Sequence, residues 1–175
     1  MIKMPFITAA NSADLEPVMQ LWVLRILVPM GWHRQFVERH GFHNDNFAYA
    51  LGLGHWLDPD AQGFDAKAVL LELRQLYRKA EKNAQNNQLP ARLLRNVAKL
   101  ADLLGLNATD CRILEFAVSV RNGGLLVEAV DLLGLLPSAK LFHALSGILN
   151  FPEAEIRASL GAHGALARSG LVWVD

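Results

Sequence analysis

Four of the six histidines lie close together in the sequence and are accompanied by one aspartate: His33, His40, His43, Asp45 and His55. Imidazole and carboxylate groups are good ligands for zinc or iron, so a metal site would be sought here first. The spacing does not favour one, because His33 and His40 stand two helical turns apart. A histidine-dependent metalloenzyme is therefore our third hypothesis, and the sequence leaves open whether these side chains converge.

No other pattern in the sequence predicts catalysis. The single cysteine, Cys111, excludes an internal disulfide and favours a reducing, cytoplasmic setting. It lies in an apolar helical pattern, which predicts a buried structural thiol rather than a nucleophile. The glycine pairs at 52–54 and 161–164 lack the lysine and hydroxyl of a phosphate-binding loop, and Gly-x-Ser-x-Gly is absent. We therefore expect no catalytic residue, no cofactor and no metal in this chain.

Charge and hydropathy exclude three classes of protein. Among 175 residues, 17 are Lys or Arg and 17 are Asp or Glu, so the formal net charge is zero, and 52% are hydrophobic. This composition argues against disorder and against a strongly basic nucleic-acid binder. The most apolar stretch, Leu21 to Met30, contains Arg25 and Pro29 and is shorter than the ~20 apolar residues of a membrane span. It is predicted to be a buried helix.

Apolar residues recur with helical spacing along the first half of the chain. Helices are predicted over 15–29, 33–40, 47–51 and from Asp65 to about 82. Ser12 is a suitable N-cap for the first of them, and Asn44 or Asp45 for the third. The helix after Asp65 is strongly amphipathic, with an apolar stripe formed by Val69, Leu70, Leu73, Leu76 and Tyr77. The glycine-containing segment 52–63 is predicted to be a loop.

The second half of the sequence predicts shorter helices, over 93–104, 111–120, 125–133, 140–149 and 153–160. Gly105 closes the first of them, Asn107 with Asp110 resembles a capping box, and Ser138 is a suitable N-cap. The polar run 82–88, followed by Pro90, is the best domain boundary. We predict an N-terminal helical subdomain over 1–88 and a second helical subdomain over 90–175. The alternative is an ordinary connecting loop within one domain.

The last part of the chain, about 138–175, resembles a winged helix-turn-helix. Asn150 stands at the tight turn between two helices, where the left-handed conformation that asparagine tolerates is needed. A third helix then leads into a predicted wing strand over 171–174. The predicted fold is mainly α: a multi-helical array that ends in a winged helix-turn-helix with a short β wing.

The second helix of this unit bears on nucleic-acid binding, because it would enter the major groove of DNA. Its outward residues include Glu153, Glu155 and Arg157, and two carboxylates in a first turn oppose phosphate. We therefore expect the unit to serve protein contact or internal packing, with this helix as the face toward a protein partner, and we do not expect nucleic acid to bind. A winged-helix DNA-binding transcription regulator is the alternative hypothesis.

Four blocks of the sequence together resemble the N-terminal region of large bacterial AAA-type ATPases: WVLRILVPMGWHRQF (22–36), GFHNDNFA (41–48), LLGLNATDCRIL (103–114) and the segment 160–175. In that family a helical region containing a winged helix precedes the nucleotide-binding core. The family's Walker A lysine and Walker B acid have no counterpart here, so ATP and magnesium are expected only in a downstream core. The resemblance implies a cytoplasmic, non-catalytic recognition or regulatory region. It would bind a protein substrate, a protein partner or its own ATPase core, and it could oligomerise through that core.

Overall fold

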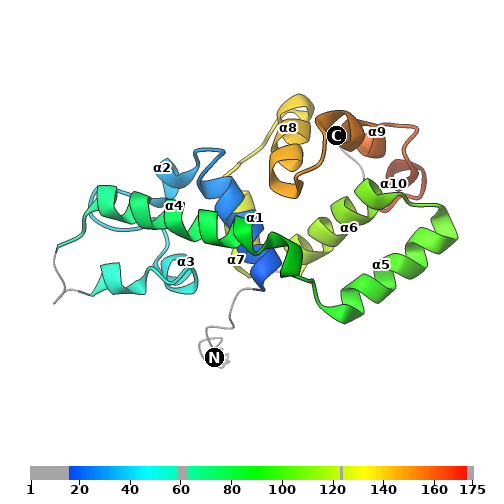
Figure 1. Ribbon diagram of the computed structural model, residues 1–175. Helices are drawn as coiled ribbons and strands as arrows, with labels where there is room; N and C mark the ends of the chain where they lie inside the picture. Colours follow the sequence, from blue (N-terminus) through cyan, green and yellow to red (C-terminus); the bar gives the residue numbers. More distant parts are fainter. Residues whose placement is uncertain (1–15, 59–62, 123, 173–175) are drawn as a thin grey trace, which may run out of the picture.

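The computed structural model describes residues 16–58, 63–122 and 124–172, and within them the fold is all-α. Ten helices follow one another: α1 (Pro17–Leu27), α2 (His33–Phe36), α3 (Asp45–Ala50), α4 (Ala66–Lys82), α5 (Ala91–Leu104), α6 (Ala108–Arg121), α7 (Leu125–Asp131), α8 (Ser138–Leu149), α9 (Glu153–Leu160) and α10 (Ala165–Arg168). Two short 3-10 helices, η1 (Gly54–Leu57) and η2 (Ala84–Asn86), flank α4. The mainly α prediction is confirmed, and Figure 1 shows the arrangement. None of the described helices is long and apolar enough to cross a membrane.

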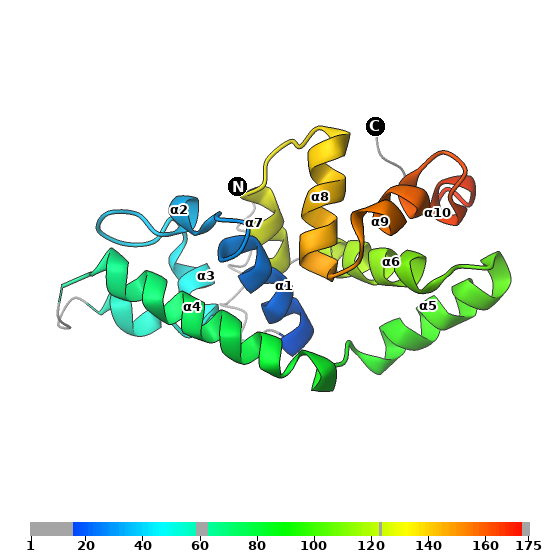
Figure 2. The ribbon, with the colours of Figure 1, turned by 45° about the horizontal axis from the view of Figure 1, so that its top comes forward.

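Helix α1 is the centre of the structure. It packs against α4, α7 and α8, and Figure 2 shows it lying between α4 on one side and α7 and α8 on the other. Nearly all its side chains are buried, including Val23, Leu24 and Ile26, and the Trp22 ring meets the Phe116 ring edge to face. The prediction that this apolar stretch is a buried helix is therefore confirmed. Burial of Val18 and of residues 21–27 removes mostly apolar surface from water, which stabilises the fold.

Local capping signals behave as the sequence predicts. The Asn44 side chain caps α3, the Asp65 side chain caps α4, and Asn107 and Asp110 form a reciprocal capping box at the start of α6. Each of these bonds satisfies a backbone N–H group that has no partner within its own helix. Gly105 ends α5 in the left-handed conformation (φ 67°, ψ 39°). These short-range interactions set where the helices begin and end.

The turn between α8 and α9 also matches its prediction. Asn150 adopts φ 59° and ψ 47° and is the one non-glycine residue with positive φ in the described part of the chain. The Ser146 hydroxyl donates to the Phe151 carbonyl and closes the turn. Helix α9 then begins at Glu153 and packs against α6, α8 and α10. The helix–turn–helix order of this region is therefore present.

Several boundary predictions were wrong. The predicted helix over 33–40 ends at Phe36, because Val37 leaves the helical conformation and pairs with Phe42 in an isolated antiparallel bridge. Ser138 is the first residue of α8 rather than its cap, since Pro137 takes the N-cap position. The described residues contain no strand; Leu171 and Val172 are irregular, so no β wing is seen there. The rest of the predicted wing and the Ser12 cap lie outside the described residues.

The helices of the two predicted subdomains share contacts. Helix α1, from the range 1–88, packs on α7 and α8, from the range 90–175. One cluster of buried apolar side chains contains residues from both ranges. Helix α5 packs mainly on α6 and lies at the far end of the molecule from α2 and α3 (Figure 1). The division at residues 88–90 stays a prediction.

Candidate functional site

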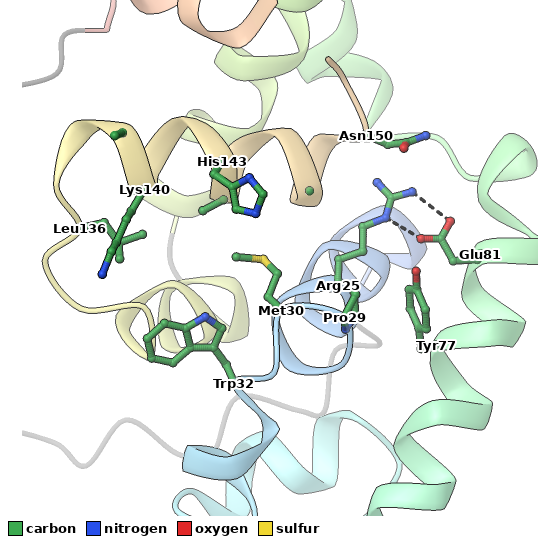
Figure 3. A pocket seen from close by; sticks show the side chains of 13 residues that line it. Arg25, Pro29, Met30, Trp32, Tyr77, Glu81, Leu136, Lys140, His143 and Asn150 are labelled. Carbon is green, nitrogen blue, oxygen red and sulfur yellow. Dashed lines mark hydrogen bonds and ion pairs between the residues drawn. The ribbon is translucent and has the colours of Figure 1, made fainter. Parts of the chain in front are cut away.

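A pocket of about 730 Å³ opens between the end of α1, the C-terminal half of α4 and one face of α8. Figure 3 shows it from close by. Three helices and the residues next to them line the pocket: Arg25 on α1, with Pro29, Met30 and Trp32 after it; Tyr77 and Glu81 on α4; and Ala139, Lys140, His143, Ala144 and Gly147 on α8, with Leu136 before it and Asn150 after it. Its volume lies in the range of roughly 300–1,000 Å³ that is typical of ligand sites. It is larger than the pocket beside Asn44 and Glu128 and than the one beside Lys79 and Asn83.

The innermost polar group of the pocket is Arg25. Its Nε and Nη2 donate to the two carboxylate oxygens of Glu81, at 2.7 and 3.0 Å, which is the strong bidentate geometry of an arginine–carboxylate pair. Its Nη1 donates to the Ile148 carbonyl at 2.7 Å. That carbonyl belongs to the last turn of α8, where no intrahelical N–H is left to bind it. One side chain on α1 therefore joins α4 and α8 and fixes the inner end of the pocket.

The Arg25–Glu81 pair controls the ionisation of its surroundings. Hydrogen bonds from Arg25 lower the pKa of the Glu81 carboxyl below its usual 4.5, although partial burial opposes them. The pKa of Tyr77, beside Glu81, is raised chiefly by burial and further by the charge and hydrogen bond of that carboxylate. At neutral pH Glu81 is therefore a carboxylate and Tyr77 a neutral phenol.

The α8 wall of the pocket is built from small residues with two longer polar ones between them. Ala139, Ala144 and Gly147 are its small lining residues, and Gly147 lies beside Met30. Lys140 and His143, both labelled in Figure 3, are exposed. These positions repeat at helical spacing, so they share one face of α8. Among the charged lining residues, Arg25 is buried and Glu81 half-buried, whereas Lys140 and His143 are exposed.

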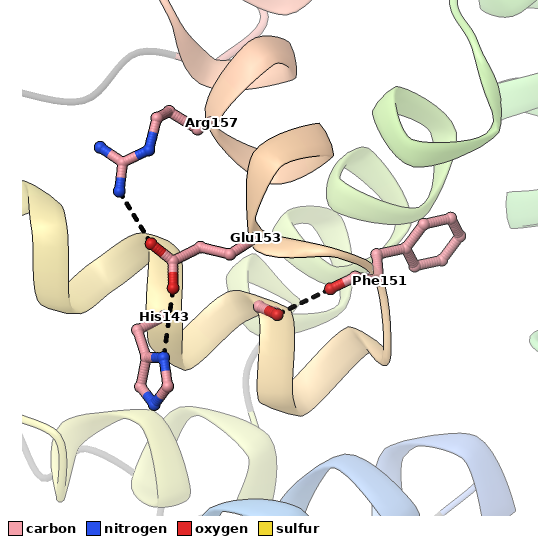
Figure 4. A network of polar contacts seen from close by, with 5 residues as sticks. His143, Phe151, Glu153 and Arg157 are labelled. Atoms are coloured by element: carbon pink, nitrogen blue, oxygen red, sulfur yellow. Dashed lines mark hydrogen bonds and ion pairs between the residues drawn. The ribbon is translucent and has the colours of Figure 1, made fainter.

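His143 also links the pocket to α9. Its Nδ1 lies 3.2 Å from Glu153 Oε2, and Arg157 donates to the other oxygen of Glu153 at 2.8 Å (Figure 4). These two contacts, that of Arg157 first, lower the pKa of Glu153. The Arg157 guanidinium lies over the Phe142 ring, 4.8 Å from its centroid. This network is exposed to solvent, so it adds little to stability and leaves His143 accessible.

The three residues predicted to face a partner thus make contacts within the chain. Glu153 and Arg157 pair with each other, and Glu155 accepts a hydrogen bond at 2.7 Å from the buried Thr109 hydroxyl of α6. Glu155 and Arg157 are exposed all the same, and Glu153 is partly so. Their role toward a partner stays a prediction.

The histidines singled out in the sequence go to separate partners. His33 Nδ1 lies 2.8 Å from the Leu27 carbonyl, His43 faces Glu38 at 3.5 Å, and His55 faces Glu72 at 3.2 Å. His40 is exposed in the turn after Val37. Across residues 16–58, 63–122 and 124–172, no three histidine, cysteine or acidic side chains come together as metal ligands. In the described part of the chain, these histidines therefore do not converge on a common metal site.

Cys111 and the described tryptophans are buried or partly buried. The Cys111 thiol is partly rather than fully buried, and burial raises its pKa, which leaves it a protonated and weak nucleophile. Trp22 belongs to the core, and Trp56 donates from Nε1 to Glu72 at 2.8 Å. Trp32 lines the pocket. Trp173 lies outside the described residues.

Sequence reasoning missed the pocket and its inner ion pair. The one available signal was Arg25 itself, a charged residue inside the most apolar stretch of the chain, because a buried arginine requires a partner. Nothing in the sequence identifies Glu81 as that partner, 56 residues away. No family model, no curated protein and no solved structure matches this chain.

Proposed function

We propose that this chain is a recognition region that binds a protein partner on the face containing the pocket. The observation that carries the proposal is an open pocket with apolar lining residues, one of which, Leu136, follows the fully exposed Leu135 in the sequence. Exposed apolar surface beside a pocket is typical of an interaction site. Because Leu135 is not among the lining residues, a partner that covers both it and the neighbouring Leu136 extends beyond the pocket. This favours a protein over a small molecule.

The chemistry of the pocket supports binding rather than catalysis. A general acid or base works best with a pKa near the operating pH. The pKa of Glu81 is lowered and that of Tyr77 is raised, so both move away from neutrality. Arg25 uses its guanidinium on Glu81 and on the Ile148 carbonyl. These groups hold the helices in place.

The proposal includes the context that the resemblance implies. The chain would be the N-terminal region of a larger AAA-type ATPase, acting in the cytoplasm, with nucleotide chemistry in a downstream core. The unit over about 138–175 would be a winged helix-turn-helix used for protein contact. In its favour are the order α8, turn, α9 and the left-handed Asn150 at the turn.

The alternative, a DNA-binding regulator, would require α9 to enter the major groove. Arg157 is the one basic residue of that helix, and it is paired with Glu153 and lies over Phe142. The first turn also holds Glu155, so the helix presents carboxylates to phosphate. Titration of mixed-sequence duplex DNA at low salt tests this alternative. Binding tighter than about 1 μM that weakens steeply with added salt would establish it in place of our proposal.

Site-specific photocrosslinking in cells tests the proposed function. The full chain would carry a benzophenone amino acid at Leu135, or, as the control, at Arg95, which is exposed on α5. We expect discrete protein adducts from position 135 and none from position 95. Each adduct would be identified by mass spectrometry and then tested with purified components. No adduct from position 135, or the same adducts from both positions, would contradict the proposal.

A further inference from the structure

We propose that the pocket binds a segment of a protein chain that carries a bulky apolar side chain next to a carboxylate, and that Lys140 pairs with that carboxylate. The inference rests on the proposed function and specifies the chemistry of the partner. Three observations support it: a glycine in α8 that the fold does not require, the apolar pocket walls and an unpaired cation at the rim.

Gly147 is the first observation. A glycine inside a helix is less stable than an alanine, so its presence calls for a reason. Its backbone is in an ordinary conformation, and a Cβ added there would meet only the Met30 sulfur, at 4.0 Å. Neither a turn nor a close approach of backbones therefore requires glycine. What the missing side chain does provide is space, because Gly147 lines the pocket.

The glycines that the fold does require look different. A Cβ at Gly164 would collide with the backbone carbonyl of Ser159, and one at Gly161 would lie 3.0 Å from the carbonyl oxygen of Arg157. Both glycines allow the close packing of the chain after α9. Gly147 has no such neighbour, so its small size serves the pocket rather than the packing of helices.

The apolar walls are the second observation. Pro29, Met30 and Trp32 form one side, and Leu136 with the α8 alanines forms the other. Met30, Trp32 and Leu136 are only partly buried, so each keeps apolar surface that a ligand would cover. An apolar side chain inserted between them would be removed from water on both sides, which is the main source of affinity in such pockets.

The charge at the rim is the third observation. Of the charged lining residues, Arg25 and Glu81 neutralise each other, and His143 faces Glu153. Lys140 is exposed and makes no hydrogen bond or ion pair with any described residue. Among the described lining residues, Lys140 is thus the one positive charge that is not compensated. A carboxylate next to the inserted side chain complements it, whereas a lysine or arginine there would be repelled.

The experiment measures binding of three short fluorescent peptides to the purified full chain by anisotropy. The peptides share a central Leu-Phe pair and differ only in flanking residues, which are glutamate, glutamine or lysine. Four variants are compared with the wild type: Gly147→Leu, which fills the pocket; Gly147→Ala, which fills less of it; Lys140→Glu; and Lys99→Glu, which makes the same charge change on the exposed surface of α5. Circular dichroism and thermal unfolding verify that each variant is folded.

We expect the glutamate peptide to bind the wild type best, with a Kd of about 1–100 μM. Lys140→Glu weakens that complex by about five- to tenfold and improves binding of the lysine peptide, while Lys99→Glu changes neither. Gly147→Leu weakens all three peptides by more than about tenfold, and Gly147→Ala weakens them by a smaller factor, because its single added carbon takes up less of the pocket. Added salt reduces the difference between peptides, because the ion pair is exposed.

Each contrary outcome would overturn a specific part of the proposal. Equal binding of the three peptides, or equal effects of the two lysine variants, overturns the carboxylate assignment. Octanoate that binds as tightly as the glutamate peptide overturns the choice of a protein segment. If no peptide binds while Leu135 still crosslinks to a partner, this inference fails and the proposed function stands. If no peptide binds and Leu135 crosslinks to no partner, both this inference and the proposed function fail.

Discussion

Replacing Glu81 by leucine should destabilise the protein more than replacing Arg25 by methionine, and combining the two should restore part of the loss. The Arg25 side chain is only 9% exposed, whereas that of Glu81 is 32% exposed. Glu81→Leu therefore leaves a buried guanidinium with the Ile148 carbonyl as its remaining partner. An uncompensated buried charge costs about 3–5 kcal/mol.

The opposite single change is milder. In Arg25→Met the Glu81 carboxylate can turn toward water, and the main loss is that of the Ile148 carbonyl's partner. Leaving one buried acceptor unsatisfied costs about 1–3 kcal/mol. The double variant buries no unpaired charge, so its loss should also be about 1–3 kcal/mol. It is then about 2 kcal/mol more stable than Glu81→Leu alone, which simple addition of the two losses would not produce.

Urea unfolding followed by helical circular dichroism measures these differences. For a domain of this size, 1 kcal/mol corresponds to a Tm shift of roughly 2–4 °C, so thermal scans are an independent check. The reasoning is refuted if Glu81→Leu lies within about 1 kcal/mol of the wild type, or if the double variant is less stable than Glu81→Leu. Either result would mean that Arg25 finds solvent or another partner.

Three further predictions concern stability. Because the pKa of Glu81 is lowered in the folded state, its contribution to the free energy of unfolding is complete above about pH 4.5 and is lost as the pH falls through the folded pKa. Urea unfolding at a series of acid pH values should therefore show the wild type losing stability relative to the double variant. Gly164→Ala should cost about 1–3 kcal/mol, since the added Cβ collides with backbone, whereas Gly41→Ala, where nothing lies within 4 Å, should stay within about 0.5 kcal/mol of the wild type by the same assay. Asn150→Ala should cost about 1 kcal/mol because alanine tolerates φ 59° poorly, and Asn150→Gly should be neutral; equal urea midpoints for the two would contradict this.

Features that depend on a few neighbouring residues were predictable from the sequence. The Asn107–Asp110 capping box involves residues three apart, and the left-handed turn at Asn150 depends chiefly on that residue's own tolerance of positive φ. The amphipathic stripe of α4 was likewise predictable, with Val69 and Leu73 buried on its inner side. In the capping box and the turn, the energy that decides the conformation comes from atoms within one or two helical turns; the stripe of α4 is predictable because its spacing alone marks the face that will be buried.

The errors arose where a more distant contact decided the conformation. Val37 continues a plausible helical pattern, yet it leaves the helix to pair with Phe42, and Phe36 packs against the rings of Phe42 and Phe47. Packing of those rings outweighs the small helical preference of a short segment. The histidine segment was similarly ambiguous, because spacing alone excludes one ion on a straight helix but says nothing about where His33 and His55 point.

The candidate site is the extreme case, since its inner end joins residues separated by 56 and 123 positions. Sequence reasoning could state that an arginine in an apolar helix requires a partner, but many acidic residues were available. Choosing Glu81 requires knowing that α4 crosses α1, which follows from the packing of two apolar surfaces rather than from any local signal. The space beside Gly147 cannot be predicted from the sequence either, because it depends on how α8 lies relative to Met30.

The arrangement separates the charges that build the pocket from the charge that is left for a ligand. The charge of Arg25 is balanced by Glu81, and three of its N–H groups donate to Glu81 and the Ile148 carbonyl, so it joins α4 and α8 and offers no net charge to a ligand. Lys140 also lines the pocket and makes no such bond with any described residue. It follows that the two sets of variants should act independently: changes at Arg25 and Glu81 should alter stability and the shape of the pocket together, whereas changes at Lys140 should alter only which ligand is preferred. A Lys140 variant that loses as much stability as Glu81→Leu would show that this separation does not exist.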